Sequence, residues 1–66
     1  MPVEVGQQFR QVTPPRDIWE VIQILQNAGP IPHARLMRVS GTKEVKTISI
    51  PALGDHRLYQ AIGEDE

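Results

Sequence analysis

The sequence predicts a mainly β domain of five short antiparallel strands, and three observations favour this fold class. Short segments rich in β-branched and aromatic residues lie between turns marked by proline or glycine. The segment 45–50, VKTISI, alternates regularly between two sets of side chains, as a strand with two different faces does. In the segment 18–25, five of the eight residues are β-branched or aromatic.

The segment 17–27, DIWEVIQILQN, also fits an amphipathic helix, which would give an α+β fold with this helix packed on a small antiparallel sheet. Asp17 and Glu20 have the spacing of a capping box, and Gly29 followed by Pro30 is a normal helix stop. Apolar residues recur at helical spacing, namely at Ile18, Val21, Ile22 and Leu25. These local signals leave strand and helix open.

The other strands follow from alternation and from the residues that end each segment. Two consecutive prolines, Pro14 and Pro15, break the first segment and begin a loop that runs through Arg16. Pro51 ends the segment 45–50, because proline has no N–H for a ladder hydrogen bond. A tight turn, of the 3₁₀ type, is expected at 52–55, ALGD. The predicted strands besides 18–25 are 7–12, 33–40, 45–50 and 57–62.

The length and composition indicate one small domain over residues 1–63, followed by a disordered acidic tail at 64–66. The absence of cysteine excludes disulfides and cysteine-type zinc sites, and it fits the cytoplasm, which we expect as the location. We expect no membrane segment and no signal peptide. Net charge is −1, and without the tail the chain has two more basic than acidic groups, far fewer than a dedicated nucleic-acid binder carries.

Taken together, the five segments resemble the layout of an SH3-like β-barrel. The matching features are a long first loop at 12–17, a strand bearing Trp19, a hairpin formed by 33–39 and 45–50, and a tight turn before a closing strand that contains Tyr59. The chain is also similar to small uncharacterised bacterial proteins in the placement of Gly6, Phe9, Trp19–Val21, Pro32–Ala34, Leu36, Thr47–Ser49, Leu53, Asp55 and Tyr59. The resemblance favours a strand at 18–25.

The same resemblance does not imply a proline-peptide groove. The chain lacks the ALYDY-like aromatic cluster, the acidic first loop and the paired tryptophans of peptide-binding SH3 domains. A shared fold alone carries no activity. We expect a non-catalytic binding or adaptor module for a protein partner.

The candidate binding residues fall into an aromatic and a basic group. Trp19 is expected in the core, whereas Phe9 and Tyr59 are candidates for an exposed binding face. The basic candidates are Arg35, Arg38, Lys43 and Lys46. They suit the alternative of a weak nucleic-acid-binding barrel if the hairpin brings them together, or a solvated face that guards edge strands.

Two further expectations concern chemistry and assembly. His33 and His56 are too few for a metal site, and no nucleophile has a base at a recognisable spacing, so we expect neither enzyme activity nor a cofactor. His33 is expected to begin a strand and to bond with the backbone. A structural homodimer is a third alternative, in which the apolar residues Ile31, Met37 and Val39 meet across a two-fold axis.

Overall fold

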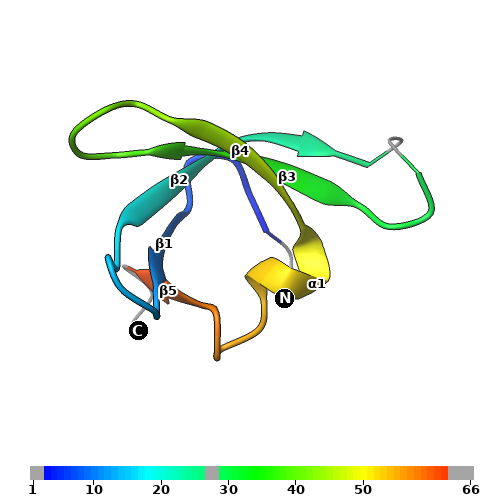
Figure 1. Ribbon diagram of the computed structural model, residues 1–66. Helices are drawn as coiled ribbons and strands as arrows, with labels where there is room; N and C mark the ends of the chain where they lie inside the picture. The colour runs from blue at the N-terminus through cyan, green and yellow to red at the C-terminus, as the bar shows by residue number, and fades with distance from the viewer. Residues whose placement is uncertain (1–2, 27–28, 63–66) are drawn as a thin grey trace.

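The chain forms one five-stranded antiparallel sheet with a short helix before the last strand (Figure 1). The computed structural model describes residues 3–26 and 29–62. Along the chain, the elements are β1 (Gln8–Gln11), β2 (Ile18–Leu25), β3 (His33–Arg38), β4 (Val45–Ser49), α1 (Ile50–Leu53) and β5 (Tyr59–Ile62). The strand order in the sheet is β4-β3-β2-β1-β5, with every neighbouring pair antiparallel. The prediction of a mainly β fold of five antiparallel strands is confirmed.

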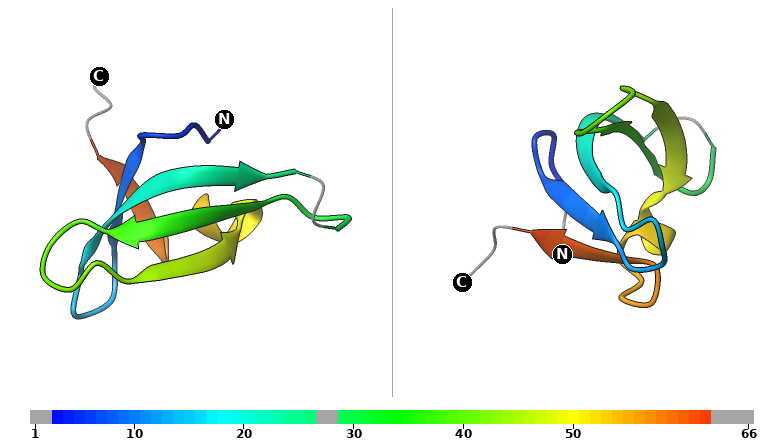
Figure 2. Two further views of the ribbon diagram at one scale, coloured as in Figure 1. Left: turned by 90° about the horizontal axis from the view of Figure 1, so that it is seen from above. Right: turned by 60° about the vertical axis from the view of Figure 1, so that its left-hand side comes forward.

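The sheet curls into a half-barrel, with β2, β3 and β4 on one side and β1 and β5 on the other (Figures 1 and 2). The long strand β2 joins the two sides, because it pairs with β1 near its start and with β3 along its length. The two ends of the sheet, β4 and β5, do not pair with each other within the described ranges. The helix α1 lies between them in the chain and covers the opening between the two sides (Figure 1).

The contested segment is a strand, so the alternative of a helix is wrong over Ile18–Leu25; positions 27 and 28 lie outside the described residues. A β-bulge between Val21 and Gln23 explains why this segment does not alternate regularly. Strict alternation would turn Gln23 inward and Ile24 outward. The extra residue, Ile22, reverses this, so that Ile24 packs against the core and Gln23 is exposed.

The expected 3₁₀ turn at 52–55 is instead one turn of α-helix that begins earlier, at Ile50. Ser49 is the N-cap, and its side-chain oxygen accepts a hydrogen bond from the backbone N–H of Ala52 at 3.3 Å. Pro51 fits within this first turn because its missing N–H would have no helical partner there. Ser49 is therefore both the last residue of β4 and the N-cap of α1, and Pro51 is the second residue of the helix.

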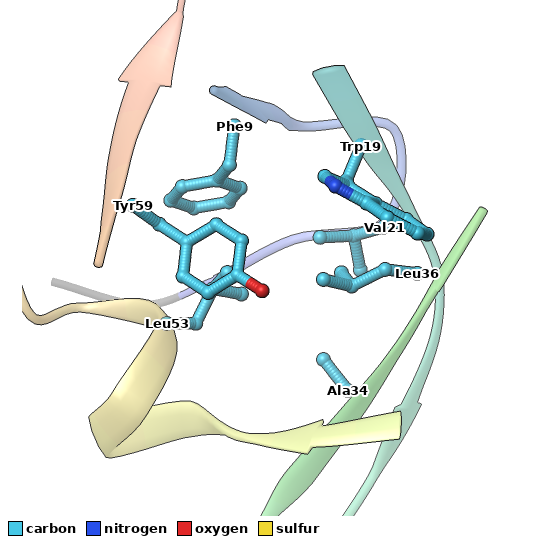
Figure 3. Close-up of a cluster of buried hydrophobic side chains, with 7 residues drawn as sticks. All are labelled: Phe9, Trp19, Val21, Ala34, Leu36, Leu53 and Tyr59. Carbon is cyan, nitrogen blue, oxygen red and sulfur yellow. The ribbon is translucent and has the colours of Figure 1, made fainter. Parts of the chain in front are cut away.

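The core lies in the concave side of the half-barrel and contains seven buried hydrophobic residues from every strand but β4, and from α1 (Figure 3). They are Phe9, Trp19, Val21, Ala34, Leu36, Leu53 and Tyr59. Val21 and Leu36 are directly opposite each other on β2 and β3. Burial of these side chains is the main stabilising contribution in a chain without disulfides.

The acidic tail predicted at 64–66 lies outside the described residues, as does Gly63. In the part of the chain that is described, no helix has the length and apolar character needed to cross a membrane.

Candidate functional site

All three aromatic residues of the chain are directed into the same core, although they come from β1, β2 and β5 (Figure 3). Phe9 and Trp19 are register partners on β1 and β2. Phe9, Trp19 and Tyr59 are 5%, 4% and 7% exposed, so none presents a ring face to solvent. The core position expected for Trp19 is observed. A role of Phe9 and Tyr59 in binding stays a prediction, and both side chains serve packing here.

Lys46 of β4 closes this aromatic cluster from the inner face of the sheet. Its Nζ atom lies 4.1 Å from the centroid of the Trp19 ring and 5.2 Å from that of the Tyr59 ring. The same atom donates a hydrogen bond to the Tyr59 hydroxyl oxygen at 2.6 Å. An ammonium over two aromatic faces gains cation–π attraction, and the hydroxyl provides an oxygen acceptor. The half-buried Lys46 side chain is therefore directed towards the core and away from the outer face.

A second polar contact holds the Trp19 ring at its indole nitrogen. The indole Nε1–H of Trp19 donates to the side-chain oxygen of Gln11 at 3.2 Å. Gln11 is the register partner of Tyr59, so β1 supports both rings. No buried side-chain nitrogen or oxygen among the described residues lacks a partner. The aromatic cluster is thus a satisfied packing unit.

The four basic candidates do not form one patch. Arg35 is exposed on the outer face, because its neighbours Ala34 and Leu36 are buried on the inner one. Arg38 forms ion pairs with Asp17 at 3.1 Å and with Glu44 at 3.0 Å. Lys43 is exposed in the turn between β3 and β4. The structure brings Lys46 to Tyr59, and it separates Arg35 from Arg38 and Lys46.

The outer face carries a small apolar surface, the outer patch, made of Ile18, Met37, Val39 and Val45. Met37 and Val45 are register partners on β3 and β4. The Val39 N–H donates to the Ile18 carbonyl at 2.9 Å, so these two residues are opposite each other as well. Val45 is 46% exposed and the other three are half-buried.

Two of the residues proposed for a dimer face, Met37 and Val39, therefore share the outer patch. The third, Ile31, is 49% exposed but precedes β3 in the chain, at the opposite end of this strand. A two-fold contact through all three residues is not favoured by this arrangement.

The edge of β4 that faces away from β3 is free within the described ranges. At the two ends of the β3–β4 ladder, the Arg38 N–H donates to the Glu44 carbonyl at 2.8 Å, and the Ile50 N–H donates to the Pro32 carbonyl at 2.9 Å. In an antiparallel pair such bonds fall on alternate residues, so the even-numbered residues of β4 bond to β3. The N–H groups of Val45, Thr47 and Ser49 and the carbonyl groups of Val45 and Thr47 point outward, and no hydrogen bond between described residues occupies them.

The other edge of the sheet, on β5, has fewer backbone groups available to a partner. By the same alternation, Tyr59 and Ala61 have their backbone groups turned away from β1. The Tyr59 N–H is already used, since it donates to the Asp55 carbonyl at 3.0 Å. This leaves β4 as the edge with the longer run of free groups. Sequence reasoning missed this site because it identified the strand but not its position in the sheet.

The titratable and metal-ligating side chains outside this edge are few. His33 begins β3, and its Nδ1 atom lies 2.8 Å from the Ile31 carbonyl oxygen, which confirms the expected backbone bond. The Arg57 guanidinium hydrogen-bonds to the Asp55 carboxylate at 3.0 and 3.1 Å and lowers the pKa of this carboxyl group. Among the residues described, no group of three His, Asp or Glu side chains is close enough to hold a metal ion.

The chain was compared with models of protein families, with curated proteins and with solved structures, and none of them matches. The geometry of the sheet and its edge is therefore the basis for inferring a function.

Proposed function

We propose that this protein is a non-catalytic binding module, of the SH3-like barrel type, that binds an extended segment of a partner protein along the free edge of β4. The observation that carries the proposal is the run of outward backbone groups at Val45, Thr47 and Ser49, next to the outer patch. An added strand would make main-chain hydrogen bonds to these groups, while its side chains would contact the exposed side chain of Val45.

The position of Lys46 removes the usual objection to strand addition. A lysine that points inward from an edge strand normally protects the edge, because an added strand would bury an unpaired ammonium group. Here the ammonium already has the Tyr59 hydroxyl and two aromatic rings as partners. Strand addition at β4 would therefore leave no new unpaired charge.

A protein partner is better supported than a nucleic acid. Phosphate binding needs several cations that reach one surface. Arg38 is held by two carboxylates, Lys46 is turned inward, and Arg35 lies on the outer face. Lys43, in the β3–β4 turn, is exposed and forms no ion pair among the described contacts, but one such lysine does not make a phosphate-binding surface. The apolar outer patch instead suits the side chains of a protein segment.

The experiment selects binders from a library of random linear peptides and compares two variants at one exposed position. Thr47→Pro removes an outward N–H, which is the group that the proposal assigns to the partner. It leaves the ladder hydrogen bonds between β4 and β3 in place. Thr47→Ala is the matched control, since it shortens the same side chain but keeps the N–H. Selected peptides should bind the wild type and Thr47→Ala alike and lose about tenfold or more in affinity on Thr47→Pro.

The chemical shifts of the labelled protein locate the contact. Under the proposal, the largest shifts on peptide addition fall on Val45, Thr47 and Ser49 and on Met37 of the outer patch. Peptides that bind Thr47→Pro as well as the wild type, or that shift residues of another surface, would overturn the proposal. A salt-sensitive affinity for a single-stranded oligonucleotide, lost on Lys43→Ala, would support the nucleic-acid alternative in its place.

A further inference from the structure

We infer that the partner which fits the β4 edge is a second copy of this chain, paired β4 to β4 in antiparallel fashion with Thr47 opposite Thr47 of the other copy. The inference rests on the proposed function, because it assigns an occupant to the same edge. A two-fold axis through Thr47 makes both copies use the same residues, as an isologous dimer requires. The result is a continuous ten-stranded sheet, from the five strands of each copy.

The free backbone groups match in this register. Each Thr47 N–H meets the Thr47 carbonyl of the other copy, and each Ser49 N–H meets the other Val45 carbonyl. All of these groups point away from β3 and are unoccupied in the described structure. Thr47 is exposed on the outer face, where two opposed threonines form a favourable cross-strand pair.

Charge disfavours the neighbouring register that is centred on Lys46. When the axis passes through Thr47, Lys46 lies opposite Ile48 of the other copy. A shift that centres the axis on Lys46 would place two lysines directly opposite each other, and like charges in that position are destabilising. The same shift would place the Ser49 N–H opposite Lys43, which lies in the turn outside β4. The sequence V-K-T-I-S is therefore self-complementary around its central threonine.

The β4 edge is accessible to a second chain because no other strand covers it in the described structure. Figure 2 (left) shows β4 at the margin of the layer that it forms with β3 and β2, with no further strand beside it. The pairing segment is only five residues long. Interfaces of this small size are typical of weak, concentration-dependent association. The expected dimer forms reversibly as protein concentration rises.

Single-cysteine cross-linking tests the register, because the chain has no cysteine of its own. Two residues of a hydrogen-bonded antiparallel pair have Cα atoms about 5.5 Å apart, within the span of a disulfide. Thr47→Cys should therefore form a disulfide dimer under mild oxidation. Val45→Cys is the matched control on the same strand and the same face, since two such cysteines would lie about 13 Å apart along the paired strands.

Two further samples complete the design. An equimolar mixture of Val45→Cys and Ser49→Cys should give the mixed dimer, because these positions are opposite each other in the inferred register. The wild-type chain and Thr47→Pro are compared by sedimentation velocity over a wide concentration range. The wild type should shift towards the mass of two chains, and Thr47→Pro should remain at the mass of one.

The inference predicts that Thr47→Cys cross-links about tenfold faster than Val45→Cys, as expected when one pair can reach bonding distance and the other cannot. Equal rates, a faster reaction of Val45→Cys, or a wild type that stays monomeric at millimolar concentration would overturn it. A monomer that still binds selected peptides in a Thr47-dependent way would leave the proposed function intact. Loss of the proposed function would instead appear as peptides that ignore the β4 edge.

Discussion

The ammonium nitrogen of Lys46 lies 2.6 Å from the hydroxyl oxygen of Tyr59, and this hydrogen bond joins β4 to β5, the two ends of the sheet. No ladder connects these strands within the described ranges, so this side-chain contact links the two sides of the half-barrel at its opening. Because this contact directs the Lys46 ammonium group inward, the group does not lie beside the outward backbone groups of β4. One residue thus helps to close the core and keeps the edge accessible.

The Lys46–Tyr59 contact should contribute measurably to stability. Lys46→Met keeps an apolar stem but removes the charge, and Tyr59→Phe keeps the ring but removes the oxygen. In a double-mutant cycle we expect a coupling energy of about 1 kcal/mol, from a hydrogen bond to a charged group that is partly exposed. Urea denaturation followed by far-UV circular dichroism measures it. A coupling near zero would mean that the two side chains do not stabilise the half-barrel together.

Truncation of a side chain should cost more stability on the inner face of the β3–β4 hairpin than on its outer face. Leu36 is fully buried, so Leu36→Ala should cost about 2–5 kcal/mol and leave a small domain largely unfolded. Val45→Ala, on the outer face of the neighbouring strand, should cost less than about 1 kcal/mol. The same denaturation measurement gives both free energies. Similar costs for the two variants would contradict the assignment of inner and outer faces.

Proline substitution along β4 should show which N–H groups bond to β3. Thr47→Pro removes an outward N–H, whereas Ile48→Pro removes one that the ladder uses. Thermal unfolding should therefore show Ile48→Pro to be less stable than Thr47→Pro by about 1–3 kcal/mol. The reverse order would place the even-numbered residues of β4, rather than the odd-numbered ones, at the free edge.

The Asp55–Arg57 pair predicts a local effect in acid. The Arg57 side chain hydrogen-bonds to the Asp55 carboxylate and holds the pKa of this carboxyl group below its ordinary value. The folded-state pKa is thus lower than the unfolded one, so any stability that it contributes is present above the unfolded pKa. This stability is lost as the pH falls through the folded-state pKa. In an NMR titration, Arg57→Gln should raise the pKa of Asp55; an unchanged titration curve would contradict the contact.

The strands other than β2 were predictable from local signals, because β-branched residues and proline breaks act locally. For 18–25 these signals left strand and helix open, and the resemblance to the SH3-like layout favoured the strand. The residues Ile18–Leu25 form a strand in spite of a capping-box pattern at Asp17 and Glu20, since the segment is apolar on both faces. The bulge at Ile22 was not predictable, because the irregular alternation of IWEVIQIL does not by itself show which residue is the extra one. The boundaries of α1 also depend on Ser49, a cap that the tight-turn pattern alone does not reveal.

The candidate site depends on contacts between residues that are distant in sequence. Phe9, Trp19 and Tyr59 meet because of the register of β1 with β2 and with β5. Lys46 reaches Tyr59 because the whole sheet curls, which no local pattern encodes. For the same reason, alternation in 45–50 identified a strand but not that this strand ends the sheet. Which residues are basic was evident from the sequence, but their separation onto different faces required the fold.

Amide hydrogen exchange along β4 tests the central claim most directly. In the dilute protein, the N–H groups of Val45 and Thr47 should exchange rapidly, and those of Lys46 and Ile48 should be protected by the bonds to β3. Saturation with a peptide selected for binding should then protect Val45, Thr47 and Ser49 as well. Strong protection of Thr47 in the dilute protein, or no gain of protection when the peptide is bound, would show that β4 is not the binding edge.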